Sequence, residues 1–73
     1  MNKSERLKQL EEMLQQNSVR IIYDVLKGEG GLCKVRDKYY VIVNRNISVE
    51  QKITLLAHGL MDVTGTPVDL DLN

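Results

Sequence analysis

The stretch YYVIVNRNISVEQKITLLAHGLMD, residues 39–62, decides the fold of this 73-residue chain. Its first five residues are β-branched or aromatic and Asn44 follows them, a composition typical of a strand that ends in a polar residue. Ser48 and Gln51 then match the capping box that opens a helix. Apolar residues recur after it at helical spacing, and they are Val49, Ile53, Leu56 and Leu60. The stretch therefore predicts a strand, a short polar connection and an amphipathic helix that packs on the sheet.

The opposite side of the same helix carries side chains that could bind a metal ion or take part in catalysis. At about 100° per residue, His58 and Asp62 lie one turn apart there, with apolar Leu55 beside them. Gly59 stands between them, and a glycine inside a helix costs about 1 kcal/mol relative to alanine. Either another element packs closely against Gly59, or the helix ends there with Gly59 as its C′ residue. The second alternative would dismantle the pairing of His58 with Asp62.

One helix and one strand are predicted upstream. Residues 2–17 carry apolar side chains at three- and four-residue spacing, which predicts a helix with Ser4 as its N-cap. Residues 19–26 alternate and are rich in β-branched side chains, which predicts a strand. Because Ile22 and Leu26 make its second face partly apolar, this strand is expected to be central.

A hairpin is predicted next, because a glycine-rich turn at residues 27–31 leads into two β-rich runs that flank Asp37-Lys38. With a two-residue loop, the cross-strand pairs include Val35 with Tyr40 and Cys33 with Ile42. These four side chains share one nearly apolar side of the hairpin, which we expect to form the core. A free cysteine in a strand is usually a small buried apolar residue, so Cys33 is expected to be buried.

Together these elements predict one α+β domain over residues 1–73, with the order helix, three-stranded mostly antiparallel sheet, helix (αβββα). The second helix should pack on one sheet face, and the first should lie beside it or cap an end of the sheet. Residues 64–67, Thr-Gly-Thr-Pro, break the second helix. Residues 68–72 alternate between apolar and acidic side chains, and residues 64–73 are open as an edge strand or a flexible tail.

Size and charge bound the function. A domain this small has a marginal core, which metal binding or self-association often supplements. Lysine and arginine together number 10, as do aspartate and glutamate, so the net charge of +0 gives no general attraction to nucleic acid or to anionic membranes. No apolar run approaches the roughly 20 residues that span a bilayer. The lone Cys33 and the absence of an export signal favour a cytoplasmic location.

The run from residue 40 to residue 58 resembles the core of the ImmA/IrrE-type zinc metallopeptidases. In that family a strand ending in Asn leads through a short polar connection to a helix carrying Leu-Ala-His-Glu-x-x-His, and the element order is also similar. The matching residues here are Tyr40 to Asn44 and then Leu55 to His58. The chain is also similar to small bacterial proteins that have Gly-Gly-x-Cys before a hairpin and a helix, a likeness that brings no function with it.

The resemblance implies that His58 occupies the position of the first zinc ligand. Gly59 stands where the family has its catalytic glutamate, and Asp62 stands where it has the second histidine. Two ligands make a weak zinc site, and activation of a zinc-bound water needs a positioned base. We therefore expect no peptidase activity and no bound cofactor. The favoured function is a non-catalytic, peptidase-derived scaffold that binds itself or another protein, with Leu55, His58 and Asp62 as the contact surface.

Two alternatives remain open. One is a metal-dependent hydrolase in which His58, Asp62 and groups from a second subunit hold zinc. The other is a weak RNA-binding module that uses Lys34, Arg36 and Tyr39, because basic side chains beside an exposed aromatic ring suit single-stranded RNA.

Overall fold

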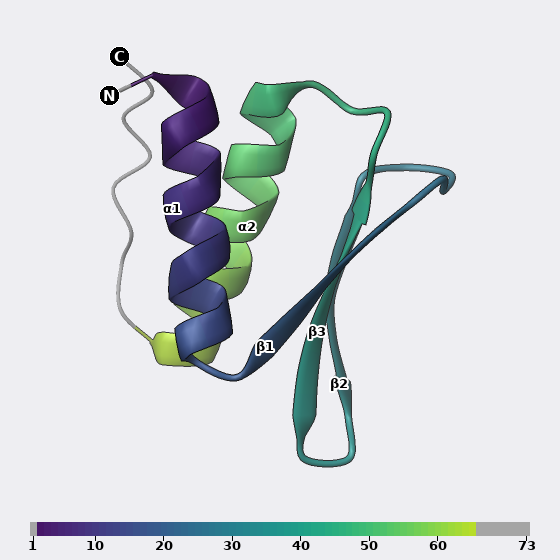
Figure 1. The fold of residues 1–73 in the computed structure, drawn as a ribbon. Coiled ribbons are helices and arrows are strands. Elements are labelled where there is room, and N and C mark those ends of the chain that lie inside the picture. Colours follow the sequence, from purple (N-terminus) through teal and green to yellow (C-terminus); the bar gives the residue numbers. More distant parts are fainter. Residues whose placement is uncertain (1, 66–73) are drawn as a thin grey trace.

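Two helices lie side by side on one side of a three-stranded sheet in this computed structural model, which describes residues 2–65 (Figure 1). The elements are α1 (Lys3–Gln16), β1 (Val19–Asp24), β2 (Gly30–Val35), β3 (Lys38–Asn44) and α2 (Val49–Thr64). The predicted α+β class and the order helix, three strands, helix are confirmed. Of the two alternatives for the first helix, the one that places it beside the second helix is confirmed (Figure 1). Of the edge strand or tail predicted for residues 64–73, Thr64 is the last residue of α2 and Gly65 is its C-cap, while residues 66–73 lie outside the described residues.

Helix α1 begins two residues earlier than Ser4 as its N-cap would place it. The Asn2 side chain is the N-cap, because its Oδ1 accepts a hydrogen bond from the Glu5 amide at 2.8 Å. Asn2 also has extended backbone angles, as an N-cap residue must. The prediction of Ser4 as the cap is therefore wrong, and Ser4 lies inside the first turn.

Strand β3 lies at the centre of the sheet, in the order β1-β3-β2. β1 pairs with it in parallel and β2 in antiparallel orientation. The expectation that residues 19–26 form a central strand is wrong, since β1 is an edge strand and ends at Asp24. The apolar Ile22 on the second face of β1 lies instead on the side of the sheet that faces away from the helices.

The hairpin turn lies one residue earlier than predicted. It consists of Arg36 and Asp37, with Val35 opposite Lys38 and Cys33 opposite Tyr40. Arg36 takes the left-handed conformation at φ +57°, which a tight two-residue turn requires. The predicted pairs are therefore shifted by two residues, a shift that leaves each side chain on its predicted side of the hairpin.

The side of the hairpin that faces the helices is the opposite of the expected one. Val41 and Val43 are fully buried, whereas Cys33 and Val35 are exposed, so the predicted burial of Cys33 is wrong. Strand β1 determines this choice. Its parallel register sets Ile21 beside Val41 and continues the apolar β1 side onto the helix-facing side of β3. The buried core comprises Leu10, Leu14, Val19, Val41, Val43, Ile53, Leu56, Ala57 and Leu60.

Helix α2 runs without interruption through Gly59 to Thr64. Both halves of the predicted capping box are present at Ser48 and Gln51, and Gly65 ends the helix in the left-handed conformation. Gly59 is buried, and a Cβ added there would lie 3.2 Å from Val41 Cγ2. The first alternative for Gly59 is thus confirmed, since its missing side chain lets α2 approach β3 closely.

A partly buried hydroxyl joins α1 to the sheet. The Tyr23 hydroxyl on β1 donates a hydrogen bond to the Glu11 carboxylate on α1. Burial raises the pKa of Tyr23 well above its ordinary range, and the neighbouring Glu11 carboxylate raises that pKa further. Since the folded state favours the neutral phenol, this contribution to stability is complete below about pH 10, the pKa of an unfolded tyrosine, and is lost as the pH rises above it.

Tyr23→Phe is expected to lower the free energy of unfolding by about 1 kcal/mol at neutral pH, because Glu11 loses its partner. Urea titrations of both proteins from neutral pH to about pH 11 should show the difference shrinking above about pH 10. Tyr40→Phe, on the other side of the sheet, is the matched control. A pH-independent difference for Tyr23→Phe would contradict the role of the neutral hydroxyl.

Candidate interaction surface

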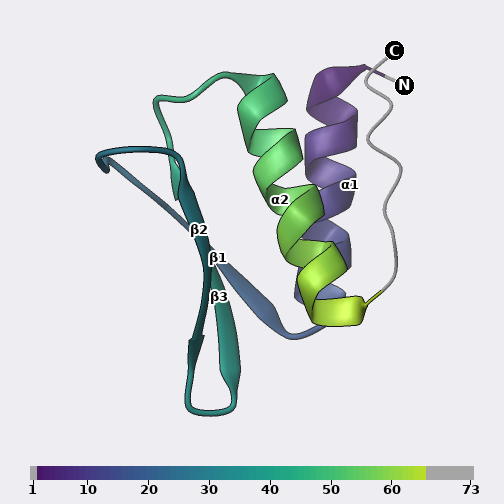
Figure 2. The same ribbon diagram turned by 180° about the vertical axis from the view of Figure 1, so that it is seen from behind.

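The side of the sheet that faces away from α1 and α2 is the candidate site, and we call it the open sheet face. Alternation along the strands places ten side-chain positions there, and they are Arg20, Ile22, Asp24, Gly31, Cys33, Val35, Lys38, Tyr40, Ile42 and Asn44. Both helices lie on the other side of the sheet in the front view and in the view from behind (Figures 1 and 2). No helix or strand within residues 2–65 therefore covers this face.

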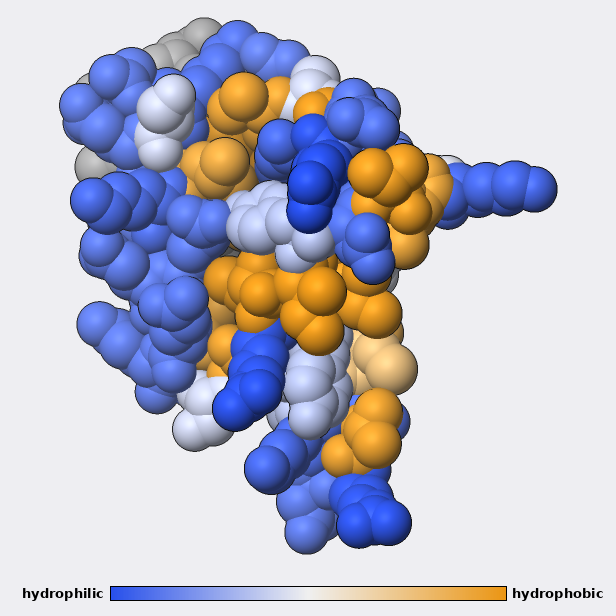
Figure 3. Space-filling model, turned by 45° about the vertical axis from the view of Figure 1, so that its right-hand side comes forward, coloured by the Kyte–Doolittle hydropathy of each residue, from blue (hydrophilic) through white to orange (hydrophobic). Residues whose placement is uncertain are grey.

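The centre of the open sheet face is apolar. Ile22 is 42% exposed and Val35 is 52% exposed, while Ile42 and Tyr40 are half-buried. Hydrophobic side chains gather over the strands in a space-filling view that turns this side forward (Figure 3). A sheet with one solvated face normally alternates apolar-in and polar-out. Large apolar residues on the wet side are the typical mark of a contact surface.

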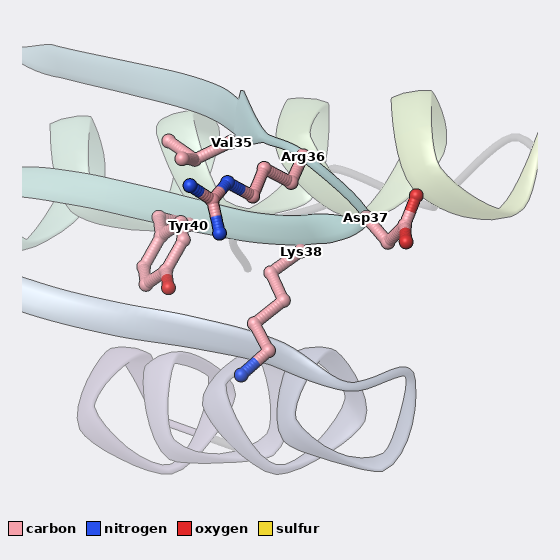
Figure 4. Close-up of a pocket in the computed structure, with 5 residues that line it drawn as sticks. All are labelled: Val35, Arg36, Asp37, Lys38 and Tyr40. Atoms are coloured by element: carbon pink, nitrogen blue, oxygen red, sulfur yellow. The ribbon is translucent and has the colours of Figure 1, made fainter.

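A shallow hollow lies at the hairpin end of this face. It is lined by Val35, Arg36, Asp37, Lys38 and Tyr40. The Arg36 side chain extends back from the turn toward Tyr40, while the Asp37 carboxylate points away from them (Figure 4). The hollow thus combines an aromatic ring, an aliphatic side chain and two cations. Val35, Lys38 and Tyr40 belong to the open sheet face as well, so the hollow is continuous with that face.

The structure does not gather the residues predicted for RNA binding on one surface. Lys34 and Tyr39 are opposite each other on the helix-facing side, with Lys34 Nζ 5.4 Å from the Tyr39 ring centroid. Tyr39 also packs against the core. Arg36 lies in the turn and lines the hollow on the other side. The aromatic ring that shares a surface with Arg36 is that of Tyr40.

The three residues predicted as the contact surface of the second helix, Leu55, His58 and Asp62, are not equally accessible. His58 and Asp62 are exposed and lie one turn apart on α2, as the helical spacing predicts. Leu55 is half-buried and packs against the core, so it contributes little free apolar area beside them. Within residues 2–65, no three side chains of the histidine, cysteine, aspartate and glutamate types come close enough to hold a metal ion.

The apolar residues of the open sheet face were visible in the sequence but were assigned to the core. The hairpin alone offers two partly apolar sides, and Cys33, Val35, Tyr40 and Ile42 form the more uniform one. The signal that separates the sides lies in β1, where Arg20, Ile22 and Asp24 alternate with more apolar neighbours. Only the parallel register of β1 with β3 relates that alternation to the hairpin.

Comparison with known proteins adds no relative to this description. The chain matches no protein-family model, no curated protein and no solved structure. In the part of the chain that the structure describes, neither helix has the length and apolar character needed to cross a bilayer.

Proposed function

We propose that this chain is a non-catalytic scaffold that binds protein through its open sheet face. The observation that carries the proposal is the apolar character of a sheet face that no helix or strand within residues 2–65 covers, above all the 42% exposure of Ile22 and the 52% exposure of Val35. Burial of such side chains against a partner contributes about 25 cal/mol per Å² of apolar surface. A flat apolar face of this kind suits another protein surface.

The helix surface supports binding less well than the sheet face. His58 and Asp62 are exposed polar groups, and exposed charges contribute about 0–1 kcal/mol per pair to a contact. The likeness of residues 40–58 to a zinc-peptidase core is the support for an origin in that scaffold. Gly59 at the position of the catalytic glutamate is the support for a non-catalytic role.

A photo-cross-linking residue placed at single positions in cells tests this proposal. We expect protein adducts from Ile22 and Val35 on the open sheet face and none from Lys8, an exposed control on α1. His58 is the third probe, because it reports on the helix surface. Adducts from His58 alone would transfer the binding role to α2, and the absence of adducts at all positions would overturn protein binding.

A further inference from the structure

We infer that the open sheet face binds a second copy of this chain, with the two sheets face to face and their strands running in opposite directions. This inference rests on the proposed function and adds the partner and its orientation. The twofold axis would cross the strands along the row formed by Ile22, Ile42 and Gly31, which are neighbours in register on β1, β3 and β2.

The row of Ile22, Ile42 and Gly31 is suited to contact with the same row of a second copy. A twofold axis along it sets Ile22 opposite Ile22 and Ile42 opposite Ile42 of the second copy, as an isologous interface requires. Gly31 has no side chain, and a Cβ built there meets nothing within 4 Å. The row therefore presents two isoleucines and a flat end, which two copies can share without an unpaired polar group.

The charges on β1 are complementary under the same rotation. Arg20 and Asp24 lie on the open sheet face, two residues before and two residues after Ile22. Reversal of the strand direction thus brings Arg20 of each copy opposite Asp24 of the other, so that two attractive pairs form in each dimer. Asp24 also accepts a hydrogen bond from the Val25 amide at 2.8 Å, which fixes its carboxylate at the strand end.

Other charges surround this pair and keep its net effect modest. Lys38 lies at the hairpin end, and Lys27, Glu29 and Arg45 surround the end of β1. Arg45 donates to the Tyr23 carbonyl at 3.3 Å. Since the chain has a net charge of +0, two copies do not repel each other as whole molecules.

The ends of the sheet also match. Val25 follows the end of β1 and is 63% exposed, and Val35 at the opposite end of the sheet is 52% exposed. These are the two most exposed large hydrophobic side chains in the described chain. A twofold rotation about this row brings the Val25 end of one copy over the Val35 end of the other, so each end of the contact carries Val25 of one copy at the β1 edge and Val35 of the other at the β2 edge.

The area of the face sets the strength of the dimer. Three strands of six or seven residues form a face about 20 Å long and about 14 Å wide. The area of such a face, about 280 Å² as a flat rectangle, is below the roughly 800 Å² that each partner buries in a standard interface. We therefore expect a weak dimer with a dissociation constant on the order of 10 μM.

Analytical ultracentrifugation of the full chain from about 1 μM to about 500 μM tests the inference. We expect a concentration-dependent dimer. Arg20→Asp and Asp24→Arg should each weaken it about tenfold, because each creates two like-charge contacts. The double variant should return to within about threefold of the original dissociation constant. Lys8→Asp and Glu12→Arg make the same charge changes at exposed positions of α1 and should leave the dimer unchanged.

Circular dichroism of each variant separates weakened dimerisation from loss of fold. The inferred interface would be overturned if Arg20→Asp and Asp24→Arg left the dissociation constant of the dimer unchanged. It would also be overturned if the double variant did not restore that constant. A monomer at every concentration would overturn self-association. If Ile22 still cross-links to a different protein in cells, the proposed binding function stands without the dimer, whereas a monomer without adducts ends both.

Discussion

Gly59→Glu is expected to destabilise the domain by at least ~3 kcal/mol, because it places a carboxylate in the contact between α2 and β3. Even the Cβ of a side chain at this position would lie 3.2 Å from Val41 Cγ2, and Val41 is fully buried. For 73 residues, the whole free energy of unfolding is roughly 4–11 kcal/mol. The substitution should therefore remove roughly a quarter to three quarters of that free energy, as measured by urea denaturation.

The neighbouring position provides a matched control. His58→Glu introduces the same side chain on the exposed side of α2 and should change the free energy of unfolding by less than about 0.5 kcal/mol. Gly59→Gln separates bulk from charge. Burial raises the pKa of a glutamate, so the deficit of Gly59→Glu should shrink as the pH falls toward about 4, while that of Gly59→Gln stays constant. Equal stability of the Gly59→Glu and His58→Glu proteins would contradict close packing at Gly59.

This experiment also bears on the proposed origin of the scaffold. Gly59→Glu would introduce the residue that the zinc-peptidase motif has after its first histidine. If the close approach of α2 to β3 excludes that side chain, then the return of one residue cannot rebuild a catalytic base in this chain. The glycine at position 59 and the tight packing of Val41 would then depend on each other.

Local signals in the sequence were sufficient for the elements and their order. The capping box at Ser48 and Gln51 and the apolar stripe from Val49 to Leu60 predicted α2 and its buried side. The contact at Gly59 was also visible as one of two alternatives, because a glycine inside a helix requires a reason. These signals depend on residues close together in the chain.

The register of the strands, and the side of the hairpin that faces the helices, depend on contacts between segments that are distant in the chain. The hairpin turn at Arg36 demands a positive φ from an arginine, which no sequence preference indicates. The choice between the two sides of β3 depends on its parallel pairing with β1, which is separated from it by the whole of β2. The open sheet face therefore could not be distinguished from the core by inspection of residues 32–44 alone.

Asn44→Asp is the second substitution with a large expected effect, since one buried amide joins three segments. Asn44 is 8% exposed, and its Nδ2 donates to the carbonyls of Leu26 at 3.0 Å and Gly28 at 2.8 Å. Its Oδ1 accepts from the Asn46 amide at 3.0 Å. An aspartate keeps that last bond but loses both donations and places a carboxylate against two carbonyl oxygens. We expect a loss of about 3 kcal/mol in the free energy of unfolding at pH 7.

The pH dependence distinguishes this cause from a general loss of packing. Two carbonyls that face the new carboxylate raise its pKa above the roughly 3.9 of an unfolded aspartate, so stability should recover as the pH falls toward about 4. Asn46→Asp adds the same charge at an exposed position two residues away and should show neither the loss nor the recovery. Faster amide hydrogen exchange within residues 25–29 should accompany the change at Asn44, because the amide holds that loop against the end of β3. If Asn44→Asp unfolds at the same urea concentration as Asn46→Asp, the loop does not depend on this side chain.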